Sequence, residues 1–130
     1  MLDQDIRSWI VRYGELITLA QRVLKECSAV CASLSLRYLI IMLGLELSNF
    51  CKYLTDKLRR ELDSNCREVL KELGIKEDLI DNLMDLASIS KALTEGKDVN
   101  DDVLIALVNR LPEGYAFLSR VIFQHMLKRL

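Results

Sequence analysis

The chain has 130 residues, of which 51% are hydrophobic and 28% are charged, with only five glycines and one proline. This length suits a single domain, 1–130, and the hydrophobic fraction is too high for a disordered chain. The net charge of −1 excludes a globally basic nucleic-acid-binding protein, although a local basic patch stays open.

The N-terminal residues and the most apolar stretch both bear on membrane targeting. Residues 1–5 are acidic and polar, whereas a secretory signal begins with positive charge and an apolar run. Residues 34–50 are the most apolar stretch, but Arg37 and Glu46 interrupt it, and a membrane span needs about 20 largely apolar residues. We therefore expect a soluble, cytoplasmic protein in which this stretch is a buried core helix.

The first predicted helix covers residues 3–27, where apolar side chains recur at spacings of three and four. The small, serine-rich stretch 28–35 predicts a break after it. A single very long helix stays an alternative, because the same spacing continues beyond the break. The residues that continue it are Cys31, Leu34, Tyr38, Ile41 and Leu45.

A second helix is expected over residues 34–62, and its first half, 38–45, is apolar on every side. Such a helix is either central in a bundle or buried in an interface with another chain. The candidate contact residues are Leu36, Leu39, Ile40, Leu43 and Leu47. They predict that the chain associates with itself or with another protein.

Shorter helices complete the predicted fold, over residues 65–73, 76–93, 100–111 and 112–130. Gly74 fits the left-handed position that ends a helix, and Asn100 fits the cap that begins one. Pro112 is expected to open the last helix, because proline is preorganised for a first helical turn. The sequence thus predicts an all-α, mostly antiparallel bundle of five to six helices, similar to a four-helix bundle, with two long N-terminal helices.

The cysteines are Cys27, Cys31, Cys51 and Cys66. Without a secretory signal we expect reduced thiols, and a thermophilic host would be the exception in which internal disulfides occur. Cys27 and Cys31 could present two thiolates, but zinc sites usually show closer Cys-x2-Cys pairs. No metal or cofactor site is therefore predicted.

The segment 70–83 resembles a helix-turn-helix with Gly74 in its turn. Its second helix would present Glu77, Asp78 and Asp81 to the major groove, and these carboxylates repel phosphate. We interpret the segment as an ordinary helical corner.

The charged residues are unevenly distributed along the chain. Residues 77–102 are strongly acidic, whereas residues 52–60 and 128–129 are basic. Complementary patches of this kind favour head-to-tail contacts between copies or docking on a charged partner, and a simple solvated face explains the same residues. The candidate residues for a nucleic-acid-binding surface are Lys52, Lys57, Arg59, Arg60 and Arg67. They predict, as one alternative, an accessory subunit whose binding weakens steeply with salt.

Arg120 and His125 match an Arg-x4-His motif, and in this they resemble the HEPN ribonucleases, small helical domains with Arg and His near a dimer cleft. The resemblance covers this helix and the overall helical size, and it implies RNA cleavage by Arg120 and His125. The chain departs from the family at Val121, where a polar residue is usual. On an ideal helix the two side chains point about 140° apart, so a shared site needs unusual geometry or a second chain.

Other catalytic patterns are missing from the sequence. It contains one histidine, no Gly-x-Ser-x-Gly elbow and no glycine-rich phosphate loop. We therefore predict a non-catalytic helical subunit with a structural or assembly role. A HEPN-like ribonuclease and a nucleic-acid-binding accessory subunit are the alternatives.

Overall fold

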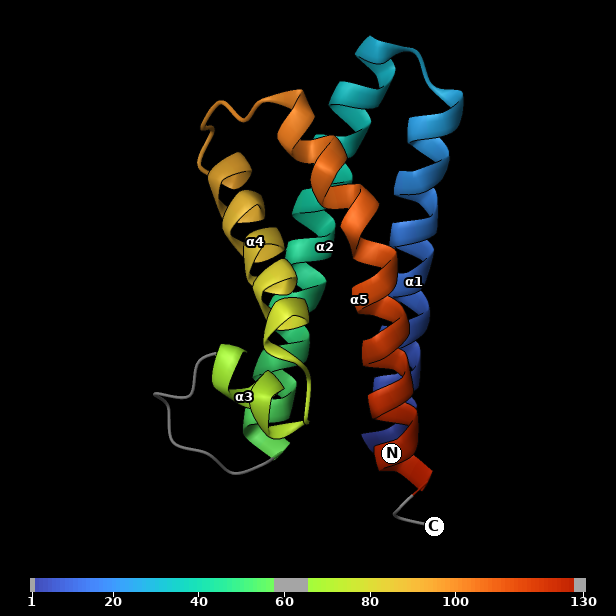
Figure 1. The fold of residues 1–130 in the computed structure, drawn as a ribbon, viewed down its shortest axis with the longest axis vertical. Coiled ribbons are helices and arrows are strands. Elements are labelled where there is room, and N and C mark those ends of the chain that lie inside the picture. Colours follow the sequence, from blue (N-terminus) through green and yellow to red (C-terminus); the bar gives the residue numbers. More distant parts are fainter. Residues whose placement is uncertain (1, 58–65, 128–130) are drawn as a thin grey trace.

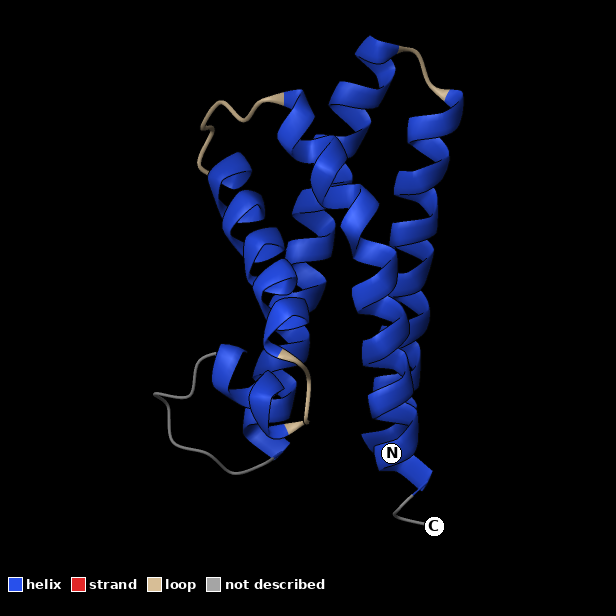
Figure 2. Cartoon of the chain, viewed as in Figure 1, coloured by secondary structure: helices blue, strands red, loops and turns tan. Residues whose placement is uncertain are grey.

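The computed structural model describes the backbone of residues 2–57 and 66–127, and the side chains of residues 6–55 and 66–124. Within these parts the chain forms five helices and no strand (Figure 2). The helices are α1 (Leu2–Glu26), α2 (Ala29–Lys57), α3 (Cys66–Glu72), α4 (Glu77–Thr94) and α5 (Asp101–Leu127). The predicted all-α helical bundle is therefore confirmed.

Four of the helices form a ring in which each one runs antiparallel to the next (Figure 1). In this ring α1 packs on α2 and α5, α2 packs on α4, and α4 packs on α5. The short α3 contacts α2 and α4 at one end of the bundle. This is the up-down-up-down arrangement of a four-helix bundle, with α3 inserted between its second and third long helices.

The predicted helix end at Gly74 and the predicted helix start at Asn100 show the expected hydrogen bonds. Gly74 has a φ of 83°, and the amide of Ile75 donates to the carbonyl of Leu70 across it at 3.3 Å. These are features of a Schellman ending, which glycine adopts without a steric penalty. At the start of α5 the Asn100 side chain accepts a hydrogen bond from the amide of Asp102 at 2.9 Å, as an N-cap does.

The second helix begins earlier than predicted, at Ala29 and not near residue 34. Ser28 precedes it, and the Ser28 hydroxyl accepts a hydrogen bond from the amide of Cys31 at 3.4 Å. A serine in this position allows the helix to begin directly after it, because its hydroxyl pairs with one of the free amides of the first turn. The alternative of one uninterrupted N-terminal helix is wrong. The predicted end at residue 62 lies outside the described residues.

The C-terminal part of the chain forms one helix and not two, because α5 continues through Pro112. A proline inside a helix removes one backbone hydrogen bond and costs about 3 kcal/mol. Here Val108 and Leu111 before it, and Leu118 and Ile122 after it, are all buried in the same core. Packing on both sides of the proline offsets its local cost, so the prediction of a sixth helix is wrong.

Buried residues from all five helices join in one hydrophobic core. The Trp9 ring stacks on Tyr13 and on Phe50, with a centroid distance of 4.0 Å to Phe50. The Trp9 indole also donates a hydrogen bond of 2.7 Å to the carbonyl of Glu46. The stacked rings and the indole hydrogen bond together hold α1 against α2.

Two glycines allow neighbouring helices to approach closely. A Cβ atom added at Gly44 of α2 would overlap the Ser90 side chain of α4. A Cβ atom added at Gly14 of α1 would lie 2.6 Å from the Cζ atom of Tyr115 on α5. The Tyr115 hydroxyl there donates to the Ile10 carbonyl at 3.1 Å. Both helix crossings therefore require glycine, because any larger residue would collide with the neighbouring helix.

The cysteines form two disulfides, Cys27–Cys31 and Cys51–Cys66, so the expectation of reduced thiols is corrected. The α1–α2 corner brings the first pair together, with Cα atoms 5.5 Å apart. The return of α3 onto α2 brings the second pair together, with Cα atoms 5.2 Å apart. Both separations lie in the usual range for a disulfide. The first bond joins residues four positions apart, whereas the second depends on the tertiary return of α3.

Candidate interaction surface

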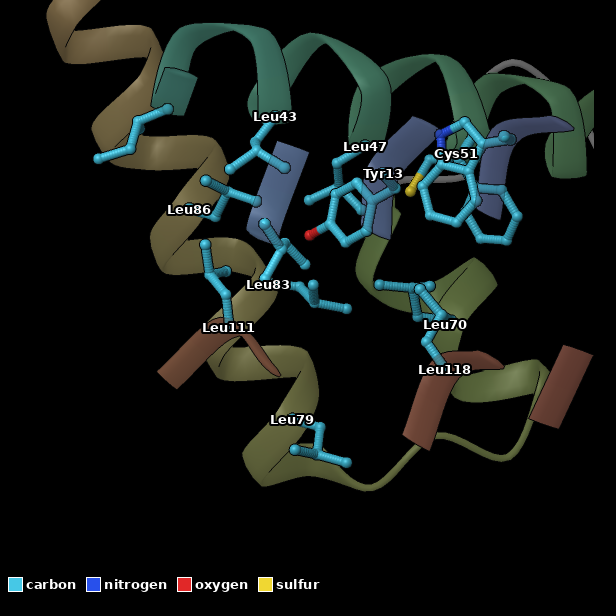
Figure 3. Packing of buried hydrophobic residues seen from close by; sticks show 14 of the residues in the cluster. Tyr13, Leu43, Leu47, Cys51, Leu70, Leu79, Leu83, Leu86, Leu111 and Leu118 are labelled. Atoms are coloured by element: carbon cyan, nitrogen blue, oxygen red, sulfur yellow. The ribbon is translucent and has the colours of Figure 1, made fainter. Parts of the chain in front are cut away.

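The five residues predicted as an interface lie inside the chain's own core. They are 0–5% exposed, namely Leu36, Leu39, Ile40, Leu43 and Leu47. Figure 3 shows Leu43 and Leu47 pointing toward side chains of the neighbouring helices. This choice of contact residues is therefore corrected, because side chains that the bundle itself covers cannot reach a partner. They hold α2 to the rest of the fold.

The opposite face of α2 carries a second apolar stripe, and this one is exposed. The exposed fractions are 73% for Val30, 67% for Leu34, 65% for Tyr38 and 59% for Leu45. The partly buried Ile41 lies between them. We call these five residues the outer α2 stripe. On an ideal helix they fall within about 80° of arc, on the side opposite the core face.

The charged side chains near the outer α2 stripe are held by other helices. Arg37 donates hydrogen bonds of 2.8 Å to Asp101 and to the carbonyl of Val99, both beside the start of α5. Glu46 forms an ion pair with Arg12 of α1 at 3.3 Å. Arg37 and Glu46 are the only charged residues between positions 29 and 51. The stripe is thus an uncharged apolar surface whose nearest charges are directed to neighbouring helices.

The composition of α2 has a second consequence. Among the described residues, α2 is the one helix long and apolar enough to span a membrane by length and composition, over Ala29–Thr55. Its mean hydropathy there is 1.7, and 33% of the segment is buried in the bundle. The apolar character of α2 therefore exceeds what the core of this chain covers.

Exposed apolar residues on the other helices are more scattered. Val11 and Leu19 of α1 are exposed, but Glu15 and Arg22 lie beside them along the same shallow depression. Phe123 of α5 is exposed near the end of the described part of the chain. No other described helix has four large apolar residues exposed on one side.

The predicted basic surface is only partly described. Lys52 is exposed on α2, whereas Arg59, Arg60 and the side chain of Lys57 lie outside the described residues. Arg67 donates a hydrogen bond of 2.6 Å to Asp81 and lies 3.6 Å from Glu77. The hydrogen bond to Asp81 raises the pKa of Arg67. The Arg67 charge thus links α3 to α4, and it is matched by carboxylates that repel phosphate.

The two residues of the HEPN-like motif both belong to α5, and Arg120 is exposed there. It lines a cleft of about 480 Å³ between α4 and α5, together with Lys76, Asp78 and Glu113. The side chain of His125 lies outside the described residues. The described part of the chain thus places Arg120 beside carboxylates, and it does not test a pairing with His125.

A further cleft of about 250 Å³ lies between α1 and α2. The buried rings of Trp9 and Phe50 form part of its wall, and Arg12 and Asn49 are polar groups along it. Arg12 is the residue that pairs with Glu46. No group of three or more metal-binding side chains occurs among the described residues. The cleft therefore shows aromatic packing and the ion pair of Arg12 with Glu46.

Comparison with known proteins gave no match: no family model fits the chain, and no curated protein or solved structure is similar to it. The likeness to the HEPN ribonucleases rests on the helix that carries Arg120 and His125 and on the overall helical size. The geometry of α2 is the feature from which a function can be argued.

Proposed function

We propose that the protein is a non-catalytic helical interaction subunit, and that the outer α2 stripe is the surface through which it binds its partner. The observation that supports this is the exposure of Val30, Leu34, Tyr38 and Leu45 along one side of a single helix. Contiguous apolar patches of this kind on a folded chain mark interaction surfaces or aggregation hazards. A partner bound on the stripe would shield these apolar side chains from water.

The stripe also has the composition of an interface centre. It combines aliphatic side chains with one aromatic residue, Tyr38, and its neighbouring charges are paired elsewhere. Protein interfaces are depleted of charge at their centre and enriched in aromatic residues. Tyrosine in particular gives a large contact area with few rotatable bonds. We therefore assign Tyr38 as the central contact residue.

The proposal is tested by photo-crosslinking inside the cells that express the chain. A benzoylphenylalanine side chain is placed at Leu34 or Leu45, and at Val11 of α1 as the matched control. Val11 is 55% exposed and lies outside the stripe, so it reports non-specific encounters. We expect discrete protein adducts from positions 34 and 45 and none of the same mass from position 11. Equal labelling at all three positions, or no adduct at any of them, would refute the proposal.

A further inference from the structure

We infer that the partner bound by the outer α2 stripe is the same stripe of a second copy of this chain, packed antiparallel about a two-fold axis beside Tyr38. This inference rests on the proposed function, because it names the occupant of that surface. Closed two-fold dimers are the commonest soluble assemblies, and they require a surface that is complementary to itself.

The spacing of the stripe has this self-complementary property. An axis midway between positions 37 and 38 places Val30 opposite the partner's Leu45 and Leu34 opposite the partner's Ile41. The two Tyr38 rings then lie on either side of the axis. Both of these pairs join two apolar side chains, and at the axis each Tyr38 lies next to the partner's Tyr38 and the partner's Arg37. A parallel pairing would instead set each residue against its own copy and place like helix ends together.

The charges of α2 permit contact between two copies, and the position of α3 favours the antiparallel arrangement. Arg37 and Glu46, the charged residues within this part of α2, are held by Asp101 and Arg12. No uncompensated charge therefore has to be buried at the contact. The disulfide Cys51–Cys66 fixes α3 beside the C-terminal half of α2 (Figure 1). An antiparallel pair keeps the two α3 helices at opposite ends of the dimer.

The area of the stripe places this dimer in a size class of interfaces. The exposed apolar surface of the four main residues is on the order of 500 Å² per chain, as large as the largest patch on a typical monomer. A symmetric pair would thus bury about 1,000 Å², which is near the lower limit for a specific interface. We expect a dimer that dissociates in the micromolar concentration range.

The first experiment is light scattering on the purified full chain over a concentration series. The expected mass rises from that of one chain toward that of two across micromolar concentrations. Leu34→Lys should keep the chain monomeric and folded, because this side chain is already 67% exposed. Val11→Lys introduces the same charge at a site of α1 that is 55% exposed, and it should behave like the unsubstituted chain. A monomer at every concentration, or equal effects of both substitutions, overturns the inference.

The second experiment tests the antiparallel register by oxidative crosslinking. Tyr38→Cys lies beside the axis, so two copies should become linked. Leu45→Cys should not link to itself, because an antiparallel pair separates the two copies of this position by about 22 Å along the axis of the helix. Linkage at both positions indicates a parallel pair, and linkage at neither indicates another surface, so either result overturns the inference.

A last comparison separates this inference from the proposed function. If the in-cell adducts from positions 34 and 45 contain only a different protein, the interaction role stands and the second copy is refuted. The purified chain is also floated with phosphatidylcholine–phosphatidylglycerol vesicles. Vesicle binding that Leu34→Lys abolishes would assign the stripe to a lipid surface and refute both. Adducts of twice the chain mass, with no vesicle binding, support both.

Discussion

The close crossing of α2 and α4 makes a quantitative prediction at Gly44. A Cβ atom added there overlaps both the Oγ and the Cβ of Ser90, which belongs to α4. Ser90 is buried and its hydroxyl donates to the carbonyl of Ile41 at 3.3 Å, so the side chain cannot simply turn away. The substitution Gly44→Ala therefore has to separate the two helices.

The size of the effect follows from two opposing contributions. Overpacking a close-packed core costs about 1–3 kcal/mol, whereas alanine is favoured over glycine inside a helix by about 1 kcal/mol. The difference between these contributions is a net loss of up to about 2 kcal/mol in the free energy of unfolding for Gly44→Ala. Gly114→Ala is the matched control, because a Cβ atom there meets nothing within 4 Å. That substitution should stabilise the chain by about 1 kcal/mol.

The assay is urea unfolding followed by circular dichroism, with the midpoint and slope compared among the variants. The order of stability should be Gly114→Ala, then the unsubstituted chain, then Gly44→Ala. The double variant Gly44→Ala with Ser90→Gly should be more stable than the sum of its single effects, by about 1–2 kcal/mol. If Gly44→Ala is as stable as Gly114→Ala, the reasoning about the crossing fails.

Three other predictions concern the core and the disulfides. Tyr13→Phe should raise the free energy of unfolding by about 1 kcal/mol, because the buried Tyr13 hydroxyl has no hydrogen-bond partner among the described residues. Burial raises the pKa of Tyr13, because the ionised hydroxyl is disfavoured in the core. Its ionisation should therefore leave the free energy of unfolding unchanged below about pH 10 and lower it as the pH rises further. Tyr13→Phe should reduce this fall in urea titrations. Replacing Cys51 and Cys66 by serine should lower the free energy of unfolding by about 3 kcal/mol, because the disulfide closes a 15-residue loop. In the unsubstituted chain, a thiol assay after unfolding without a reductant should detect no free thiol. Leu43→Lys should unfold the chain, as seen by circular dichroism, because a charge would replace a side chain with no exposed surface; a folded monomer would contradict this assignment.

The parts of the fold that could be predicted from the sequence are those determined locally. Gly74 and Asn100 mark helix ends through their own backbone conformation or side chain, and both act as expected. Pro112 was misleading because its local preference competes with the burial of Val108, Leu111 and Leu118 in one core. Local propensity is a weak guide wherever a large apolar face is packed on both sides of a residue.

Contacts between distant residues could not be predicted from spacing. Cys51 and Cys66 are joined because α3 folds back on α2, and nothing in the intervening sequence specifies that return. The ion pair of Arg67 with Asp81 has the same origin, because it joins α3 to α4. Each of these contacts depends on how helices are placed in three dimensions.

The candidate surface shows what a pattern can and cannot decide. The residues Leu34, Tyr38, Ile41 and Leu45 were visible as a three-four series, and they suggested a longer first helix. The same helix contains a second series through Leu36 and Leu43, and both series satisfy the same periodicity. Periodicity identifies an apolar face, but it does not say whether the face is covered by the chain itself or by another molecule.

The asymmetry between α1 and α2 finally explains why the surface belongs to α2. In α1 the buried residues Ile6, Trp9, Tyr13 and Ile17 form one stripe, and the exposed apolar residues are separated by charges. A helix of this kind needs only the core of its own bundle. In α2 the buried and the exposed apolar residues lie on opposite sides, so the bundle can cover only one of them. A second apolar face lowers solubility unless another surface covers it, and this is the role that we propose for the partner of α2.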